Sequence, residues 1–368
     1  MDSAAETVVK NEMACKSCGA TLTFKPGTLK LVCQYCNAEN EIVQEANLEI
    51  IENNLEEFLA KHSETQEKIV VNTIKCETCG ATSTINPKLT SDKCPFCSTT
   101  FILNKGSASS VYKPQYLLPF GIDARKAMEN FRTWLQRLWF APSELKHYAD
   151  RADRLNGMYL PYWTFDCQTE SSYTGQKGID FRETETYTDS QGKTQRRTVT
   201  RTEWYPASGH VSNTFDDILI EASTSLPKAR LRALEPWDLK NVVKYNDQYL
   251  SGFRTENYQV DLPNAYQDGK KRMHEEILTT IRRDIGGDRQ RVDSVNTTYN
   301  NPTFKYILLP VWISAYKYKE KIYQFVINAR TGEVQGERPY SAFKIALAVI
   351  GGLIVAGVIY YLTQQQQN

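Results

Sequence analysis

The hydrophobic positions along the chain are densest near its C-terminal end. From Ile345 to Leu362, eighteen residues follow one another without a charge, which is the length that a helix needs to cross the apolar part of a bilayer. A buried core helix is the alternative, but this run has no polar face. We therefore predict a single transmembrane helix over residues 343–362.

The flanks of this run predict its orientation and a helix contact. Lys and Arg residues gather between residues 317 and 344, and no charged residue follows the run, so the large domain is expected in the cytoplasm. Ala348, Gly352 and Ala356 recur every four residues, and small side chains at this spacing allow a second helix to approach closely. The expected partners therefore include the lipid bilayer and a second membrane helix.

The middle of the chain alternates apolar and polar residues and is rich in aromatic residues, which is typical of strands. Helical periodicity appears at 123–139 and 264–285, and residues 181–205 read as a long solvated hairpin that turns near Asp189–Gly192. Two similar segments, YLPYW at Tyr159–Trp163 and LLPVW at Leu308–Trp312, suggest two related antiparallel halves. We predict an α+β domain with an antiparallel sheet over residues 111–340.

Two connecting segments have their own patterns. Apolar residues recur at three- and four-residue steps from Leu48 to His62 among glutamates, which predicts an amphipathic helix within a helical linker at 47–68. The run Gly106–Ser110 is predicted to be a flexible linker.

The cysteines form a repeat. Each group has two CxxC pairs with fourteen residues between them, and the groups are 61 residues apart. Two such turns aim four thiolates at one ion, and Gly19 and Gly80 suit the positive φ that the turn needs. We predict zinc ribbons at 11–46 and 74–105, each holding one Zn²⁺, with the ligands Cys15, Cys18, Cys33 and Cys36 in the first and Cys76, Cys79, Cys94 and Cys97 in the second.

Two other uses of these cysteines remain open. Disulfides need an oxidising compartment, and the first ten residues lack the apolar run of a signal peptide. Iron accepts the same four thiolates, although the short spacing favours zinc. Four protein ligands leave no open position for water, so catalysis by the metal is not expected.

The charged residues of the ribbon region indicate which kind of partner the ribbons bind. Residues 1–110 hold ten lysines, fourteen acidic residues and no arginine, and arginine is the side chain that reads phosphate and guanine with two hydrogen bonds. Protein contact is therefore favoured over nucleic acid. The best basic surface is on the hairpin, at Arg196, Arg197 and Arg201, where anionic headgroups or an acidic partner could bind.

Enzyme motifs are missing from the sequence. The four histidines form no HExxH, and GxSxG is absent. Cys167 could be a reactive thiol, but its place in an alternating strand favours a buried structural cysteine. We expect no enzymatic activity.

Several motifs together resemble a known family. The CxxCGA ribbons, LPF at Leu118–Phe120, YLPYWTFD at Tyr159–Asp166, YLSGFRTENY at Tyr249–Tyr258 and FVINARTGEVQGERPYS at Phe325–Ser341 look like bacterial zinc-ribbon membrane proteins. These often carry a label taken from the primosomal protein N-prime, a replication-restart helicase. A helicase needs a GxxxxGK[ST] loop, and none is present in the sequence.

The resemblance implies a membrane adaptor, in some bacteria associated with stomatin/prohibitin-like and phage-shock-type envelope-stress proteins. It supplies no catalytic residues. The sequence thus predicts a multi-domain chain with two small β zinc ribbons, an α+β domain and one C-terminal membrane helix, acting as a membrane-anchored zinc-binding adaptor. A membrane-associated nucleic-acid-binding protein and a hydrolase without a known motif are the alternatives.

Overall fold

The first ribbon is a small antiparallel sheet. The computed structural model describes residues 13–43, 50–60, 68–84, 91–97, 99–102, 107–142, 155–188, 190, 192–318 and 321–365. Lys25 pairs with Lys30, and Gly27 turns the chain between them with a φ of +76°, which glycine adopts without strain. The strands are β1 (Leu22–Lys25), β2 (Lys30–Cys33) and β3 (Glu39–Glu41).

The second ribbon consists of two small sheets. One has the order β6-β5-β9 and the other pairs β7 with β8. The predicted flexible linker at 106–110 is wrong for its described part, because Ser107–Tyr112 forms strand β9 and pairs with β5 along six residues. Serine content alone did not show that an edge of β5 was available to this segment. The strands are β5 (Lys68–Lys75), β6 (Thr82–Thr84), β7 (Ser91–Lys93), β8 (Thr100–Ile102) and β9.

The predicted helical linker at 47–68 is confirmed only in part where the structure describes it. Only Leu55–Ala60 form a helix, α2, and Asn53–Asn54 form strand β4 on the central sheet. The Asn54 side chain accepts a hydrogen bond from the Glu57 N–H at 2.9 Å, which caps the helix where the extended segment ends. Leu48 and His62 lie outside the described residues.

The central sheet has nine strands and is mainly antiparallel. Its main order is β12-β11-β15-β10-β13, with β4, β14, β16 and β17 attached at its sides. The two similar segments are neighbours in it, because Leu160 pairs with Leu309 and Tyr159 with Pro310. The remaining elements of this domain are β10 (Tyr116–Leu117), α3 (Ala124–Arg137), β11 (Asn156–Thr188), β12 (Thr194–Glu221), α5 (Lys228–Arg232), η2 (Leu239–Asn241), β13 (Val243–Lys244), η3 (Asp247–Leu250), β14 (Arg254–Thr255), α6 (Leu262–Ile285), β15 (Arg289–Tyr318), β16 (Lys321–Asn328) and β17 (Val334–Gly336).

The helices α3 and α6 confirm the periodicity at 123–139 and 264–285. Helix α3 buries Ala127, Phe131 and Leu135, and α6 buries the stripe that includes Met273, Ile277 and Ile281. Both helices begin at an aspartate whose side chain accepts a backbone N–H of the first turn, the usual N-cap.

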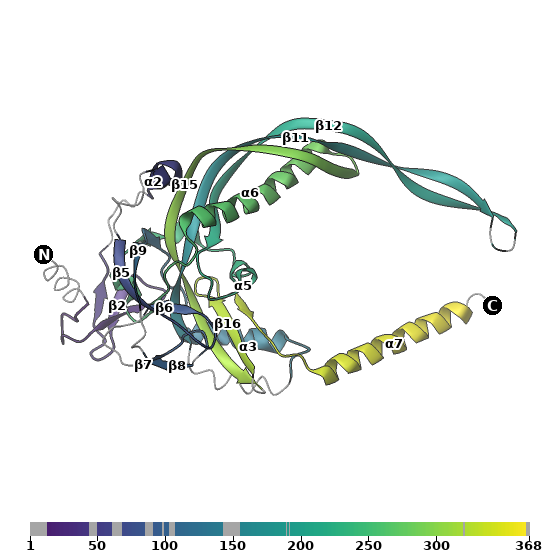
Figure 1. Ribbon diagram of the computed structural model, residues 1–368. Coiled ribbons are helices and arrows are strands. Elements are labelled where there is room, and N and C mark those ends of the chain that lie inside the picture. The colour runs from purple at the N-terminus through teal and green to yellow at the C-terminus, as the bar shows by residue number, and fades with distance from the viewer. Residues whose placement is uncertain are drawn as a thin grey trace.

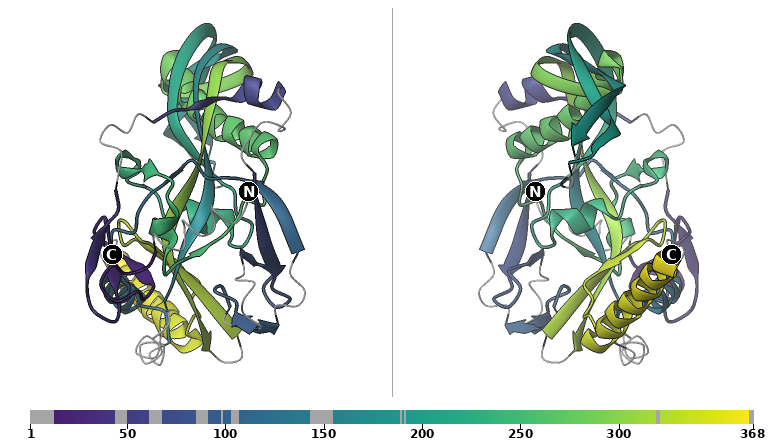
Figure 2. Two further views of the ribbon diagram at one scale, coloured as in Figure 1. Left: turned by 90° about the vertical axis from the view of Figure 1, so that its left-hand side faces the viewer. Right: turned by 90° about the vertical axis from the view of Figure 1, so that its right-hand side faces the viewer.

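Strands β11 and β12 form a curved arm that leaves the body of the protein, with α6 along its inner side (Figures 1 and 2). Strand β15 accompanies β11 only as far as the pair Gly178 and Arg289. Beyond it the arm is a two-stranded ribbon of residues 179–203, here called the tip. The predicted hairpin at 181–205 is the end of this much longer hairpin; Asp189 and Gln191 lie outside the described residues.

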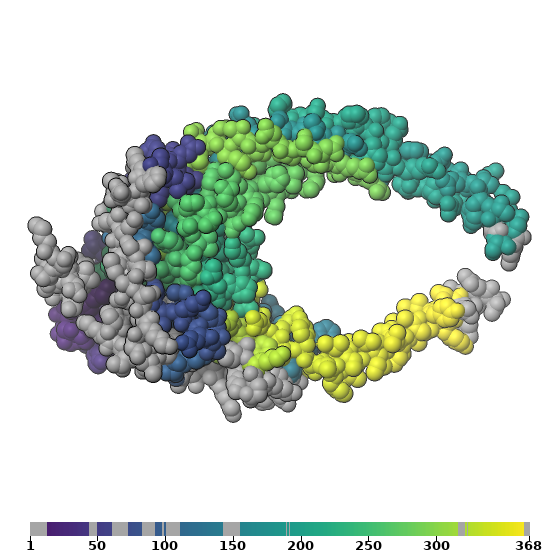
Figure 3. Space-filling view, viewed as in Figure 1, coloured from purple at the N-terminus to yellow at the C-terminus, as the bar shows by residue number. Residues whose placement is uncertain are grey.

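Helix α7 (Ala342–Gln365) leaves the body toward the same side as the arm, and the two enclose a wide opening in the space-filling view (Figure 3). Its segment Ala342–Thr363 is long and apolar enough to cross a membrane and is 0% buried. An added Cβ at Gly352 would meet nothing within 4 Å, so the predicted contact face is open at this residue.

Candidate metal centres

The first cysteine group sits on two turns of the same shape. In the first turn, Gly19 N–H donates to the Cys15 carbonyl at 2.8 Å, and Gly19 has a φ of +73°. In the second, Asn37 N–H donates to the Cys33 carbonyl at 2.9 Å, and Asn37 has a φ of +58°. Asparagine and glycine are the residues that tolerate this conformation best.

These turns bring the four sulfurs together. The Sγ–Sγ distance is 3.5 Å from Cys15 to Cys36 and 3.5 Å from Cys18 to Cys33. Backbone N–H groups of Ser17 and Cys18 point at the Cys15 sulfur and lower the pKa of that thiol to about 6. Backbone N–H groups lower the pKa of Cys33 as well, whereas hydrogen bonds with neighbouring thiols raise the pKa of Cys18 and Cys36. The turns therefore favour the thiolate, the form that binds a metal ion, at the first cysteine of each pair.

The second group repeats this geometry. Gly80 has a φ of +76°, and its N–H donates to the Cys76 carbonyl at 2.8 Å. The Sγ–Sγ distance is 3.6 Å from Cys76 to Cys97 and 3.6 Å from Cys79 to Cys94. As predicted, both glycines after the second cysteine adopt positive φ.

Both groups fit a tetrahedral metal ion. A metal–sulfur bond of about 2.3 Å implies an edge of roughly 3.8 Å between sulfurs, close to the distances seen. In each group all four sulfurs lie within 4.8 Å of one another. The eight predicted cysteines are thus assembled into two closed four-thiol clusters, each of which could hold one metal ion.

The two clusters differ in exposure. In the first ribbon Cys15 and Cys33 are buried, whereas Cys18 and Cys36 are exposed. In the second ribbon Cys76, Cys94 and Cys97 are buried, and they join a hydrophobic cluster with Phe96 and residues of the central sheet. The first site faces solvent on one side, and the second is covered by the body of the protein.

The first ribbon is fixed to the loop that joins η3 to β14. The Phe24 N–H donates to the Ser251 carbonyl at 3.0 Å, and the Ser251 hydroxyl donates to the Leu22 carbonyl at 2.5 Å. The Phe24 ring meets the rings of Tyr249 and Phe253 edge-on, with centroids 5.2 and 6.2 Å away. This ribbon is held by both its main chain and its apolar side.

The second ribbon is fixed to the same loop a few residues later. Arg254 Nη1 donates to the Lys93 carbonyl at 3.0 Å. The Thr82 N–H donates to the Ser225 hydroxyl at 3.2 Å, and that hydroxyl donates in turn to the buried carboxyl of Glu256. Residues 249–256 therefore hold both ribbons, and we call them the shared loop.

The shared loop is the functional feature that sequence reasoning missed. It lies within the motif Tyr249–Tyr258, one of those that carry the family resemblance, to which the sequence assigned no role. The available signal was a Ser-Gly pair between aromatic residues. Gly252 has a φ of +88°, and a Cβ added to it would lie 3.3 Å from the side chain of Thr23 in the first ribbon. A side chain at this residue would press on that ribbon.

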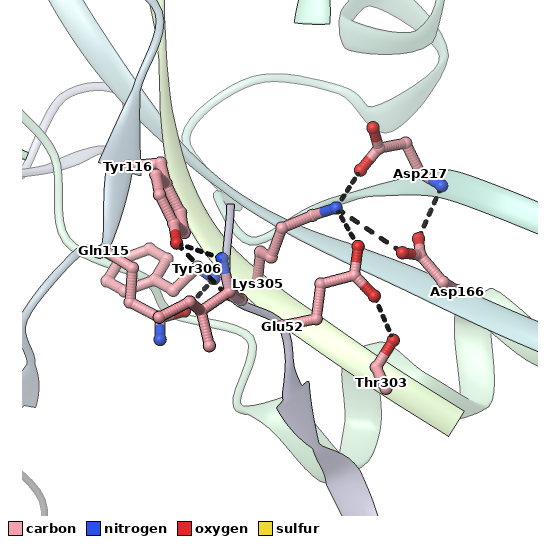
Figure 4. A network of polar contacts seen from close by, with 9 residues as sticks. Glu52, Gln115, Tyr116, Asp166, Asp217, Thr303, Lys305 and Tyr306 are labelled. Carbon is pink, nitrogen blue, oxygen red and sulfur yellow. Dashed lines mark hydrogen bonds and ion pairs between the residues drawn. The ribbon is translucent and has the colours of Figure 1, made fainter. Parts of the chain in front are cut away.

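The segment between the ribbons is anchored by charge (Figure 4). Lys305 Nζ lies 2.7 Å from Glu52, 2.7 Å from Asp217 and 3.5 Å from Asp166. Burial, together with the neighbouring Glu52 carboxyl, raises the pKa of Asp166 to about 7. Asp166, Asp216 and Asp217 lie close enough to hold a metal ion, but the lysine ammonium already supplies a cation to two of them.

Two further predictions concern single side chains. Cys167 is buried as predicted, and burial raises the pKa of its thiol, which lowers its reactivity. On the tip, Arg197 forms an ion pair with Glu185 at 3.1 Å, and Arg201 pairs with Glu183 at 2.6 Å. The predicted basic surface at Arg196, Arg197 and Arg201 is therefore partly neutralised by neighbouring glutamates.

Comparison with known proteins adds one relative. The chain is 27% identical over 252 residues to the uncharacterized protein YdjG of Bacillus subtilis strain 168, and the matched region is 66% of this chain and 70% of that protein. No protein-family model matches the chain, and no solved structure matches it. The relative's name gives no activity, so function has to be argued from the site.

Proposed function

We propose that this protein is a membrane-anchored, zinc-binding adaptor that presents its first ribbon to cytoplasmic proteins. In this proposal α7 spans the cytoplasmic membrane, the ribbons lie in the cytoplasm, and each cysteine cluster holds one Zn²⁺. The family resemblance points to stomatin/prohibitin-like or phage-shock-type proteins as the class of partner.

The observation that carries the proposal is a set of exposed apolar side chains on a ribbon that is otherwise held firmly. Tyr35, between two cysteines of the first cluster, is 83% exposed, Val43 is 89% exposed and Leu29 is 47% exposed. The ribbon itself packs on the shared loop through Phe24. Large exposed apolar side chains on a rigid support are typical of protein-contact surfaces.

The closed clusters support a structural role for the metal. Four thiolates fill a tetrahedral shell and leave no position for water or substrate. Such a site contributes its binding free energy to folding, which keeps a ribbon of few strands in shape. The cytoplasm, where thiols stay reduced, supports zinc binding rather than disulfides.

A co-purification experiment tests the adaptor role. The full chain is solubilised from membranes in detergent, and its partners are compared for wild type, Tyr35→Ala and Val43→Ser, with zinc content measured to show that the ribbon is folded. Tyr187→Ala on the arm is the matched control, because Tyr187 is 43% exposed. Loss of the same partners in the two ribbon variants but not in the control supports the proposal; unchanged partners in all variants contradict it.

The alternatives have less support. A nucleic-acid-binding role needs uncompensated cations, whereas Arg197 and Arg201 are engaged with Glu185 and Glu183. A hydrolase needs an activated nucleophile or an open metal position, and neither cysteine cluster offers one.

A further inference from the structure

Two hydrogen bonds join the end of α3 to the start of α7. Neither helix contains a cysteine of the two clusters. The Ser341 N–H donates to the Phe140 carbonyl at 2.8 Å. The Lys344 ammonium donates to the Ala141 carbonyl at 2.7 Å. Residues 138–142 and the first turn of α7 are therefore one structural unit, which we call the α3–α7 joint.

Large aromatic side chains surround this joint and face solvent. Trp139 is 79% exposed and Phe140 is 40% exposed at the end of α3. Tyr340 is 60% exposed and Phe343 is 72% exposed at the start of α7. Tryptophan and tyrosine are enriched where membrane proteins meet the headgroup region, because their rings are apolar and their edges are polar.

A groove of about 620 Å³ lies between the two parts of the joint. Apolar side chains provide most of its lining, from both α3 and α7. Lys344 also lines it. The apolar lining residues are Leu135, Leu138, Trp139, Ala141, Pro142, Leu347 and Ala348.

Lys344 determines the depth at which the joint lies relative to the bilayer surface. It is the charged residue of the apolar segment Ala342–Thr363, and a lysine near the end of a membrane helix keeps its ammonium at the interface. Because this ammonium is bonded to Ala141, the end of α3 must lie at the same level. Leu347 and Ala348, one helical turn further along α7, then lie at the depth of the upper acyl chains.

The charged residues that flank the joint in the sequence are mostly basic, which favours an anionic lipid. Arg137 ends α3, Arg338 precedes α7 with its guanidinium 5.3 Å from the Tyr340 ring centroid, and Lys344 adds a third cation. The acidic neighbour Glu337 forms an ion pair with Arg230 at 2.6 Å. Basic residues beside a membrane helix attract anionic headgroups.

We propose that the α3–α7 joint is a binding site for an anionic phospholipid, with its headgroup at Lys344, Arg137 and Arg338 and its upper acyl chain in the groove. The inference rests on the proposed membrane location of α7. It adds that the body of the protein is seated on the bilayer surface by a second contact, instead of hanging from α7 alone.

Quenching of tryptophan fluorescence by brominated lipids tests this site. Bromine quenches only tryptophans close to it, and the segment 342–363 contains none. The full chain is reconstituted in phosphatidylcholine vesicles with and without phosphatidylglycerol, with bromine near the headgroup end of the acyl chains. We expect quenching in wild type, a marked reduction of it in Trp139→Phe, and more quenching with phosphatidylglycerol than without it.

Trp237→Phe is the matched control, because Trp237 is only 8% exposed and its removal should leave the quenching unchanged. Lys344→Gln should abolish the gain from phosphatidylglycerol. An alkaline wash, which removes proteins that do not span the bilayer, distinguishes a failure of the lipid site from a failure of the membrane anchor. If the protein stays in the vesicles but is not quenched, the lipid site is contradicted and the membrane anchor is not. A second copy of the chain in the groove would give this same result and would likewise contradict the lipid site. Protein that washes off overturns both.

Discussion

The hydroxyl of Ser251 donates a hydrogen bond to the carbonyl oxygen of Leu22, and this contact joins the sheet domain to the first strand of the first ribbon. Three residues later, Arg254 reaches the Lys93 carbonyl of the second ribbon. The ribbons are therefore parts of one folded body and not modules on flexible tethers.

Ser251→Ala should loosen the first ribbon. The variant leaves the Leu22 carbonyl without its side-chain partner, which costs about 1–3 kcal/mol for a buried group. Amide hydrogen exchange at Leu22–Lys25 should become faster. Thr28→Ala is the control, because the Thr28 hydroxyl also donates to a carbonyl, that of Lys25 at 2.7 Å, but at an exposed site. Equal acceleration in both variants would contradict the anchoring role.

Gly19→Ala and Gly80→Ala should weaken metal binding. An added Cβ meets nothing within 4 Å at either residue, so the effect comes from the positive φ alone, at about 1–2 kcal/mol. Metal transfer to a colorimetric chelator should be faster in both variants. Gly→Asn at the same positions should be milder, since Asn37 already occupies the equivalent turn position at a φ of +58°. An equal effect of Ala and Asn would show that backbone strain is not the cause.

The two clusters should lose metal in a fixed order. Cys18 and Cys36 are exposed, whereas Cys76, Cys94 and Cys97 are buried against the body. In a chelator titration followed by alkylation and mass spectrometry, the cysteines of the first ribbon should be modified before those of the second. Simultaneous modification would mean that the body does not protect the second site.

Asp166 should make stability depend on pH. Its pKa is raised from 3.8 to about 7 in the folded protein, so the folded state binds more protons than the unfolded state between these values. Its contribution is therefore present at low pH and is lost as the pH rises toward 7. Asp166→Asn should flatten the fall of Tm over this range. The amide oxygen of the substituted side chain can still accept the Asp217 N–H, which lies 2.6 Å from the Asp166 carboxylate in wild type; an unchanged pH profile would falsify the assignment.

The cysteine clusters could be predicted from the sequence because their determinants are local. Two residues between cysteines and a glycine after the second one already define the turn, and Gly19 and Gly80 have the expected φ. The anchoring of the ribbons could not be predicted, since the Ser251 and Leu22 partners are 229 residues apart. The linker at 47–68 failed for the same reason: β4 pairs with Thr303 and Phe304, and this long-range pairing outweighs helical periodicity.

The tip carries charged side chains that are unfavourable in the hydrocarbon core of a bilayer. Arg201 is paired with Glu183 and Glu185 there, and moving such a group into lipid is costly. The arm nevertheless points toward the same side as α7. If α7 crosses a bilayer, the tip therefore has to turn aside at Gly178, where β15 stops supporting β11. Trypsin added to the side of the vesicles that carries the body of the protein should then cut after Arg196 and Arg197, whereas protection would show that the tip is shielded.

This turn would change the mechanics of the whole molecule. A chain that rests on the membrane at the α3–α7 joint and again at a tip folded along the surface is restrained in tilt as well as in height. The opening between the arm and α7 in Figure 3 would then lie between the arm and the membrane surface. Anything that the first ribbon recruits would be held at a fixed angle to the membrane plane.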